Sequence, residues 1–85
     1  MGDLHVTLYS GPTNEELALA RRFLEERGIQ YEEKNVVEST GARGELEHYT
    51  GRGDYPSINV DGHVVSGFAP EKWEHLLMTN LRRGR

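Results

Sequence analysis

The chain has 85 residues, no cysteine and a formal net charge of −4 at pH 7. This length predicts one domain, residues 1–85, and the acidic balance argues against nonspecific nucleic-acid binding, which needs a basic face. The absence of cysteine excludes disulfides and favours a reducing, cytoplasmic location. No apolar run reaches the roughly 18 residues of a membrane span, and the start MGDLHVTLY lacks the features of a secretory signal, so no membrane partner is expected.

The first predicted elements are a strand and a helix. The run HVTLY at residues 5–9 is rich in β-forming residues and short enough to be a buried strand. A helix is predicted over residues 15–27, ended by Gly28, and either Thr13 or Asn14 can cap its start. Its apolar stripe consists of Leu17, Ala20, Phe23 and Leu24.

A second strand and a second helix follow. The strand is predicted over Tyr31–Val37, and Lys34 within it suits the edge of a sheet, where a charge blocks unwanted pairing. The helix begins after Ser39 or Thr40 and closes at Gly51. Its predicted apolar stripe consists of Ala42, Leu46 and Tyr49.

The last third of the chain predicts a hairpin and a third helix. Pro56 opens the strand SINV, and Asp61-Gly62 is a strong signal for a two-residue turn into an antiparallel strand at residues 63–66. Pro70 suits the first turn of a helix. This helix is expected to bury Trp73, Leu76, Leu77 and Leu81. The order βαβαββα predicts an α/β fold with a four-stranded mixed sheet and three helices.

Three segments of the chain carry a resemblance to a known family. They are VTLYSGPT, RRFLEERGIQYEE and DYPSINVDGHVVSGFAPEKWEHLL. Together, and in this order, they resemble the glutaredoxin-like branch of the thioredoxin fold along nearly the whole chain. The run SGFAPEKW is closer to the redoxins that donate electrons to ribonucleotide reductase than to glutathione-binding glutaredoxins. The resemblance implies a single thioredoxin-fold domain with the sheet order 2-1-3-4.

The resemblance breaks at the reactive site. The two cysteines of the family's Cys-x-x-Cys motif align with Asn14 and Leu17. Disulfide exchange requires a thiolate, and neither a carboxamide nor an isobutyl group supplies one. No catalytic residue and no cofactor are therefore expected. The replacement favours structure, since Asn is a good helix cap and Leu extends the apolar stripe; an engineered or decayed oxidoreductase remains an alternative.

The ligand groove of the family binds through backbone hydrogen bonds, so it could be retained without the redox cysteines. Pro56 aligns with the cis-proline beside which the family's backbone pairs with an extended peptide or glutathione, and Gly67 aligns with a glycine that allows a ligand to approach. Tyr55 and Phe68 are either walls of this groove or part of the core. Glutathione is a doubtful ligand, because Gly11, Pro12, Ala69 and Pro70 stand where the glutathione-binding type has charged residues.

The function predicted first is a redox-inactive module that holds a peptide or protein partner in this groove. Its expected binding residues are Pro12, Thr13, Asn14, Tyr55, Pro56, Gly67 and Phe68. A small scaffold or interaction domain is the other alternative. No metal is expected, because the spacing of the four histidines, His5, His48, His63 and His75, is not that of metal ligands. Arg52-Gly53-Asp54 spells a cell-attachment tripeptide, which is read as chance.

Overall fold

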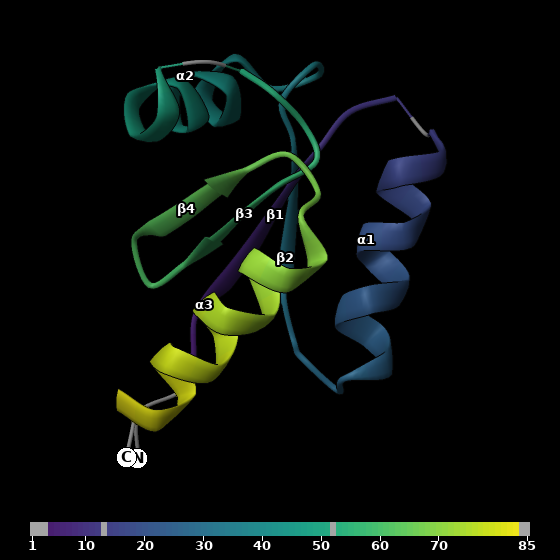
Figure 1. The fold of residues 1–85 in the computed structure, drawn as a ribbon. Coiled ribbons are helices and arrows are strands. Elements are labelled where there is room, and N and C mark those ends of the chain that lie inside the picture. The colour runs from purple at the N-terminus through teal and green to yellow at the C-terminus, as the bar shows by residue number, and fades with distance from the viewer. Residues whose placement is uncertain (1–3, 13, 52, 84–85) are drawn as a thin grey trace.

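The order of the elements is the predicted one, βαβαββα. The computed structural model of the chain describes residues 4–12, 14–51 and 53–83. Its elements are β1 (Val6–Ser10), α1 (Glu15–Glu26), β2 (Glu32–Asn35), α2 (Thr40–Thr50), β3 (Ser57–Val60), β4 (His63–Ser66) and α3 (Pro70–Arg83). The four strands form a mixed sheet in the order β2-β1-β3-β4, which confirms the predicted sheet (Figure 1).

The pairing of the strands follows from their connections. β1 runs parallel to β2, with Tyr9 opposite Lys34, and antiparallel to β3. β3 and β4 form a hairpin whose two turn residues, Asp61 and Gly62, have φ angles of 51° and 93°. Positive φ at both positions is the type I′ turn that matches the twist of the flanking strands. Lys34 lies on the edge strand, as its charge predicts.

The strand β2 is shorter than the predicted range of residues 31–37. The side-chain Oδ1 of Asn35 accepts hydrogen bonds from the backbone N–H groups of Val37 and Glu38, each at 2.9 Å. This local turn takes the backbone out of the sheet directly after Asn35. The strand therefore ends there, although the apolar residues continue.

Two helices cover one face of the sheet and the third covers the other (Figure 1). Side chains of α1 and α3 pack with alternate residues of β1 and β3 into the larger core cluster. Its buried members are Val6, Leu8, Leu17, Ala20, Phe23, Leu24, Ile58, Val60, Trp73 and Leu77. The predicted burial of Trp73 and Leu77 is thus confirmed, Leu76 packs partly buried against the cluster, and the side chain of Leu81 lies outside the described part.

The second cluster lies beneath α2 and is small. It consists of Tyr9, Val36, Ala42 and Leu46. The prediction that Tyr49 completes the buried stripe of α2 is wrong, since this side chain is 47% exposed. Ala42 and Leu46 are four residues apart, and their line along the helix continues to Thr50; Tyr49 instead packs its ring edge-on against His48 at the surface, with centroids 5.6 Å apart.

The ends of the helices follow the sequence closely. α1 ends at Glu26, one residue before the predicted end, and Gly28 follows with a φ of 66°. Ser39 caps α2 by accepting a hydrogen bond from the N–H of Ala42 at 3.1 Å. Across the described segments, no helix has the length and apolar character that crossing a bilayer requires.

Candidate functional site

Asn14, which the family resemblance aligns with the first redox cysteine, caps α1. Its backbone is extended, with φ −144° and ψ 179°, and its Oδ1 accepts a hydrogen bond from the N–H of Leu17 at 2.8 Å. The backbone oxygen of Asn14 accepts from the N–H of Ala18 at 3.1 Å. Asn14 is therefore the cap that the sequence offered beside Thr13, which lies outside the described residues.

Leu17, which the resemblance aligns with the second cysteine, is fully buried in the larger core cluster. Both positions of the motif thus serve the fold: one side chain satisfies a backbone donor at the helix start and the other fills the core. Neither can attack a disulfide, and the chain contains no other sulfur atom than those of its methionines. The arrangement has no thiol for disulfide exchange.

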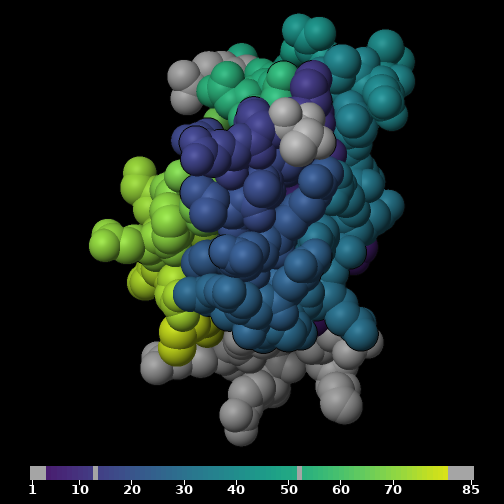
Figure 2. All heavy atoms as spheres, turned by 90° about the vertical axis from the view of Figure 1, so that its right-hand side faces the viewer, coloured from purple at the N-terminus to yellow at the C-terminus, as the bar shows by residue number. Residues whose placement is uncertain are grey.

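Tyr55 and Pro56 lie on the loop that leads into β3. The Tyr55–Pro56 peptide bond is cis, and Pro56 is fully buried. The ring of Tyr55 lies against Gly11, on the loop that leaves β1: a Cβ atom on Gly11 would come within 2.5 Å of Cε2 of that ring. Figure 2 shows this end of the molecule, where the violet residues before α1 lie beside the green residues before β3.

The backbone of Tyr55 has unused hydrogen-bonding groups. Strand β3 begins only at Ser57, and no described residue makes a hydrogen bond with the N–H or the C=O of Tyr55. The neighbouring backbone is satisfied locally, since the hydroxyl of Ser57 donates to the carbonyl oxygen of Asp54 at 2.7 Å. The N–H and the C=O of Tyr55 therefore have no partner within residues 4–12, 14–51 and 53–83.

Gly67 and Phe68 lie at the end of β4, and Ser57 connects them to this loop. The N–H of Gly67 donates to Oγ of Ser57 at 3.2 Å, and the carbonyl oxygen of Gly67 accepts from Nε1 of Trp73 at 3.0 Å. Gly67 has a φ of 80°, and no atom lies within 4 Å of the position that a Cβ would take. The surface above Gly67 is thus open.

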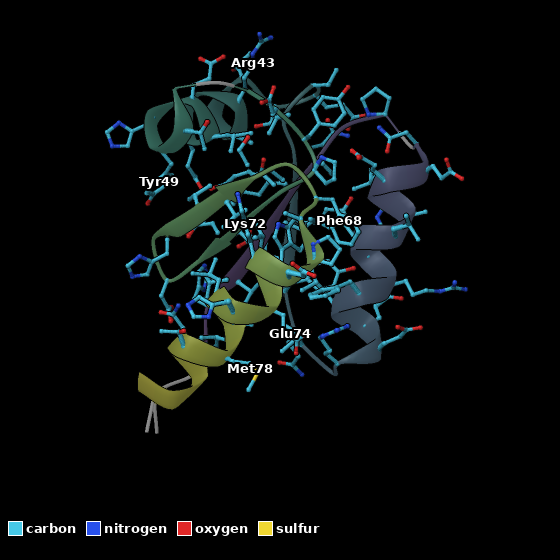
Figure 3. The ribbon with its side chains drawn as sticks, in the orientation of Figure 1. Arg43, Tyr49, Phe68, Lys72, Glu74 and Met78 are labelled. Atoms are coloured by element: carbon cyan, nitrogen blue, oxygen red, sulfur yellow. The ribbon has the colours of Figure 1, made fainter. Side chains whose placement is uncertain are left out.

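Phe68 belongs more to the core than to the groove. Its ring packs edge-on against Phe23 of α1 and Trp73 of α3, with centroid distances of 5.9 and 5.0 Å. Figure 3 shows Phe68 between these two helices. Phe68 is nevertheless only partly buried, and it follows Gly67 directly in the chain. Pro12, at the other end of the predicted site, is exposed.

The charges at this end of the molecule are acidic. Glu15 and Glu16 are exposed in the first turn of α1, where carboxylates suit the positive end of the helix dipole. Within the described chain, no group of three or more His, Asp or Glu side chains is arranged to hold a metal ion.

A polar network under α2 is absent from the sequence-based prediction. The buried hydroxyl of Tyr9 donates a short hydrogen bond to the carboxylate of Glu45 and accepts one from Nδ2 of Asn59 at 3.2 Å. Lys34 pairs with the same carboxylate at 3.1 Å. Burial, followed by the contact with Glu45, raises the pKa of Tyr9 to about 12, and the hydrogen bond from Tyr9 lowers the pKa of Glu45. These contacts join residues that are far apart in the sequence. A local sequence pattern therefore does not predict them.

Comparison with known proteins gives the same picture as the fold. The family model described as Glutaredoxin matches residues 6–65. A curated relative from Clostridium pasteurianum is described as an uncharacterized glutaredoxin-like 8.6 kDa protein in the rubredoxin operon. It is 25% identical to this chain over 72 residues, which make up 85% of this chain and 96% of the relative.

Two solved structures are similar over most of their length. The thioredoxin-like protein BC3987 is 30% identical, with a TM-score of 0.78, over 84% of this chain and 97% of its own. The glutaredoxin grx-1 from Archaeoglobus fulgidus is 17% identical and shares the fold, with a TM-score of 0.74, over 91% of this chain and 87% of its own. Because the family model matches residues 6–65, 60 of the 85 residues, the chain belongs to the glutaredoxin family.

Proposed function

We propose that this chain is a redox-inactive binding module that holds an extended segment of a partner protein beside Pro56. The proposed binding surface consists of Pro12, Asn14, Tyr55, Pro56 and Gly67 and is called the Pro56 groove. The observation that carries the proposal is the unpaired N–H and C=O of Tyr55. An extended peptide presents a donor and an acceptor at the same spacing, as in strand addition to a sheet edge.

The open surface at Gly67 supports the same mode of binding. A peptide that pairs with Tyr55 needs room on both sides of its backbone, and nothing lies within 4 Å of the Cβ position of Gly67. The local hydrogen bonds of Ser57 fix the loop that carries Tyr55 before any ligand arrives. A groove ordered in advance loses less conformational entropy on binding.

The missing thiol separates binding from catalysis. In a redoxin, the peptide is a transient substrate because the thiolate attacks it; here Asn14 offers a carboxamide already engaged with Leu17. Glutathione is disfavoured, since the places of the charged residues that would bind its carboxylates hold Gly11, Pro12, Ala69 and Pro70, and Glu15 and Glu16 add negative charge nearby. A peptide that places no carboxylate near Glu15 and Glu16 should therefore bind better than glutathione.

Disulfide tethering tests the proposal, because the chain has no cysteine of its own. Asn14→Cys places a thiol at the groove, and Arg22→Cys places one on the exposed outer face of α1 as the matched control. Each variant is equilibrated with the pentapeptide acetyl-AVCVA-amide and with cysteamine. Backbone pairing with Tyr55 should favour the peptide over cysteamine about tenfold more at position 14 than at position 22, or about 1.4 kcal/mol. The same ratio at both positions contradicts the proposal.

A further inference from the structure

The helix α2 is held on the sheet by less apolar surface than α1 or α3. It buries two small or medium side chains, Ala42 and Leu46, whereas α1 buries four and α3 buries Trp73 and Leu77. The small cluster beneath α2 has four buried members against ten in the larger cluster, to which no residue of α2 belongs. Within the residues that the structure describes, α2 also covers its face of the sheet without a neighbouring helix (Figure 1). Because apolar burial is the main force that holds elements together, α2 should be the helix that detaches most easily.

Two glycines weaken α2 itself. Gly41 and Gly44 lie inside the helix, and glycine lowers helix stability relative to alanine, whereas α1 contains no glycine. A helix of 11 residues is also too short to persist in water once it has left the sheet. Detachment of α2 should therefore unfold it and expose its amides to hydrogen exchange.

A polar contact between α2 and the sheet centres on Glu45. Its carboxylate accepts the short hydrogen bond from Tyr9 of β1 and pairs with Lys34 of β2 at 3.1 Å. The side chains of Lys34 and Glu45 are 31% and 35% exposed, so water can replace this ion pair when the helix leaves. The hydrogen bond from the buried Tyr9 is therefore the main polar contact that keeps α2 docked.

The position of Tyr55 depends on α2. The ring of Tyr55 is partly buried and packs against the small cluster, to which α2 contributes Ala42 and Leu46. Gly53, two residues earlier, lies over an ion pair of α2: a Cβ atom on Gly53 would be 3.6 Å from Nε of Arg43 and 3.5 Å from Oε2 of Glu47. The residues that lead to Pro56 thus rest on the docked helix.

We propose that α2 opens away from the sheet as a separate cooperative unit, and that its docking positions Tyr55 in the Pro56 groove. The rest of the fold stays formed while α2 is open, because the larger cluster joins α1 and α3 to β1 and β3 without it. A ligand that binds only when Tyr55 is in place should shift the equilibrium towards docked α2, and this coupling is reciprocal. The coupling rests on the proposed function, whereas the separate opening of α2 does not.

Native-state hydrogen exchange of the free chain tests the separate opening. The amide of Leu46 in α2 should exchange about tenfold or more faster than that of Leu24 in α1, after correction for intrinsic rates. The amides of Leu46, Glu47 and His48 should share one free energy of opening that falls as urea is added, which distinguishes opening of a unit from fraying of a helix end. Equal opening free energies for Leu46 and Leu24 without urea overturn the proposal.

Two variants separate the opening of α2 from unfolding of the whole chain. Ile58→Val weakens the larger cluster, which stays formed while α2 is open, so it should speed exchange at Leu24 about fivefold and leave Leu46 unchanged. Ala42→Gly weakens contacts that are lost in both processes and should speed exchange at both amides by the same factor. A parallel increase at Leu46 and Leu24 in Ile58→Val would show that α2 opens only with the whole chain, and the proposal would fail.

The coupling is tested with the Asn14→Cys variant, joined by a disulfide either to acetyl-AVCVA-amide or to cysteamine. Exchange at Leu46 should be about tenfold slower in the peptide adduct, the factor expected for pairing with Tyr55, and equal in the two adducts of Arg22→Cys. Slower exchange at Tyr55 with unchanged exchange at Leu46 contradicts the coupling and leaves the proposed function standing. If the peptide slows neither amide, the proposed function fails, and Ile58→Val still decides whether α2 opens separately.

Discussion

The ring of Tyr55 lies against the backbone of Gly11, so that a Cβ atom on Gly11 would approach Cε2 to 2.5 Å and Cζ to 2.6 Å. This contact joins the loop after β1 to the loop before β3, the two loops that border the Pro56 groove. Gly11 is buried beneath the ring. The position of Tyr55, and with it the position of its free backbone groups, therefore depends on the absence of a side chain at residue 11.

Replacing Gly11 should test this contact directly. Gly11→Ala must displace the Tyr55 ring, and we expect the free energy of unfolding to fall by about 1–3 kcal/mol, as for an overpacked site. Gly44→Ala is the control, because Gly44 lies inside α2 with nothing within 4 Å of its Cβ position. That variant should gain about 0.5–1 kcal/mol from helix propensity. Urea unfolding measures both, and a loss in Gly11→Ala no larger than experimental error would contradict the contact.

The cap of α1 should be measurable in the same way. Asn14→Ala removes the acceptor for the N–H of Leu17 and should lower the free energy of unfolding by about 1 kcal/mol, whereas Asn14→Asp should keep most of it. Ser39→Ala removes the equivalent bond to Ala42 in α2 and serves as the reference loss. If Asn14→Ala is neutral while Ser39→Ala is not, Asn14 is held for its ligand and not for the helix.

The buried hydroxyl of Tyr9 should give the chain a specific loss of stability at high pH. Its pKa is raised to about 12, and an unfolded tyrosine ionises near 10. Because the folded pKa is the higher one, its contribution to stability is complete below about pH 10 and is lost as the pH rises from 10 towards 12.

Tyr9→Phe removes that titration together with the hydrogen bonds to Glu45 and Asn59. It should cost about 1–3 kcal/mol at pH 7, since the buried Asn59 and the partly exposed Glu45 lose their hydrogen bonds with Tyr9, and the loss between pH 10 and 12 should become shallower. Tyr49→Phe, at an exposed ring, is the control and should change neither. The measurement is thermal unfolding of each variant between pH 10 and 12. If the stability of wild type and of Tyr9→Phe falls in parallel above pH 10, the raised pKa of Tyr9 is not the cause of the loss.

The start of α1 should still activate a thiol. Asn14→Cys would place the sulfur at the helix N-terminus, where backbone N–H groups and the dipole favour the thiolate, so its pKa should fall from about 8.5 to about 7. Glu15 and Glu16 oppose this shift, but both are exposed and screened by solvent. The rate of alkylation against pH measures the pKa, with Arg22→Cys as the ordinary thiol. A value at or above 8.5 would show that the site has lost the redoxin geometry.

The sequence predicts the fold because its signals are local. Asp61-Gly62 specifies the turn between β3 and β4, Gly28 and Gly51 end helices, and the order of strands and helices predicts a mixed sheet of four strands. The strand order 2-1-3-4 follows from the family resemblance. The errors are also local in origin: the side chain of Asn35 ends β2 early, and Tyr49 turns away from the line of Ala42 and Leu46.

The sites are less predictable, because they depend on tertiary contacts. The motif positions Asn14 and Leu17 follow from the family resemblance, but the contact of Tyr55 with Gly11 joins residues 44 positions apart. The bond between Tyr9 and Glu45 spans 36 positions. Neither pair forms a periodic pattern, and the only signal for the backbone groups of Tyr55 is the resemblance of Pro56 to the family's proline.

The backbone of Tyr55 offers the most direct test of peptide binding in the Pro56 groove. The Asn14→Cys variant is joined by a disulfide either to acetyl-AVCVA-amide or to cysteamine, and hydrogen exchange of the Tyr55 amide is measured in both by NMR. If an extended peptide pairs with Tyr55, exchange of this amide should slow by about tenfold or more in the peptide adduct, as a hydrogen bond requires opening before exchange. Equal exchange rates in the two adducts would contradict binding of a peptide backbone at this site.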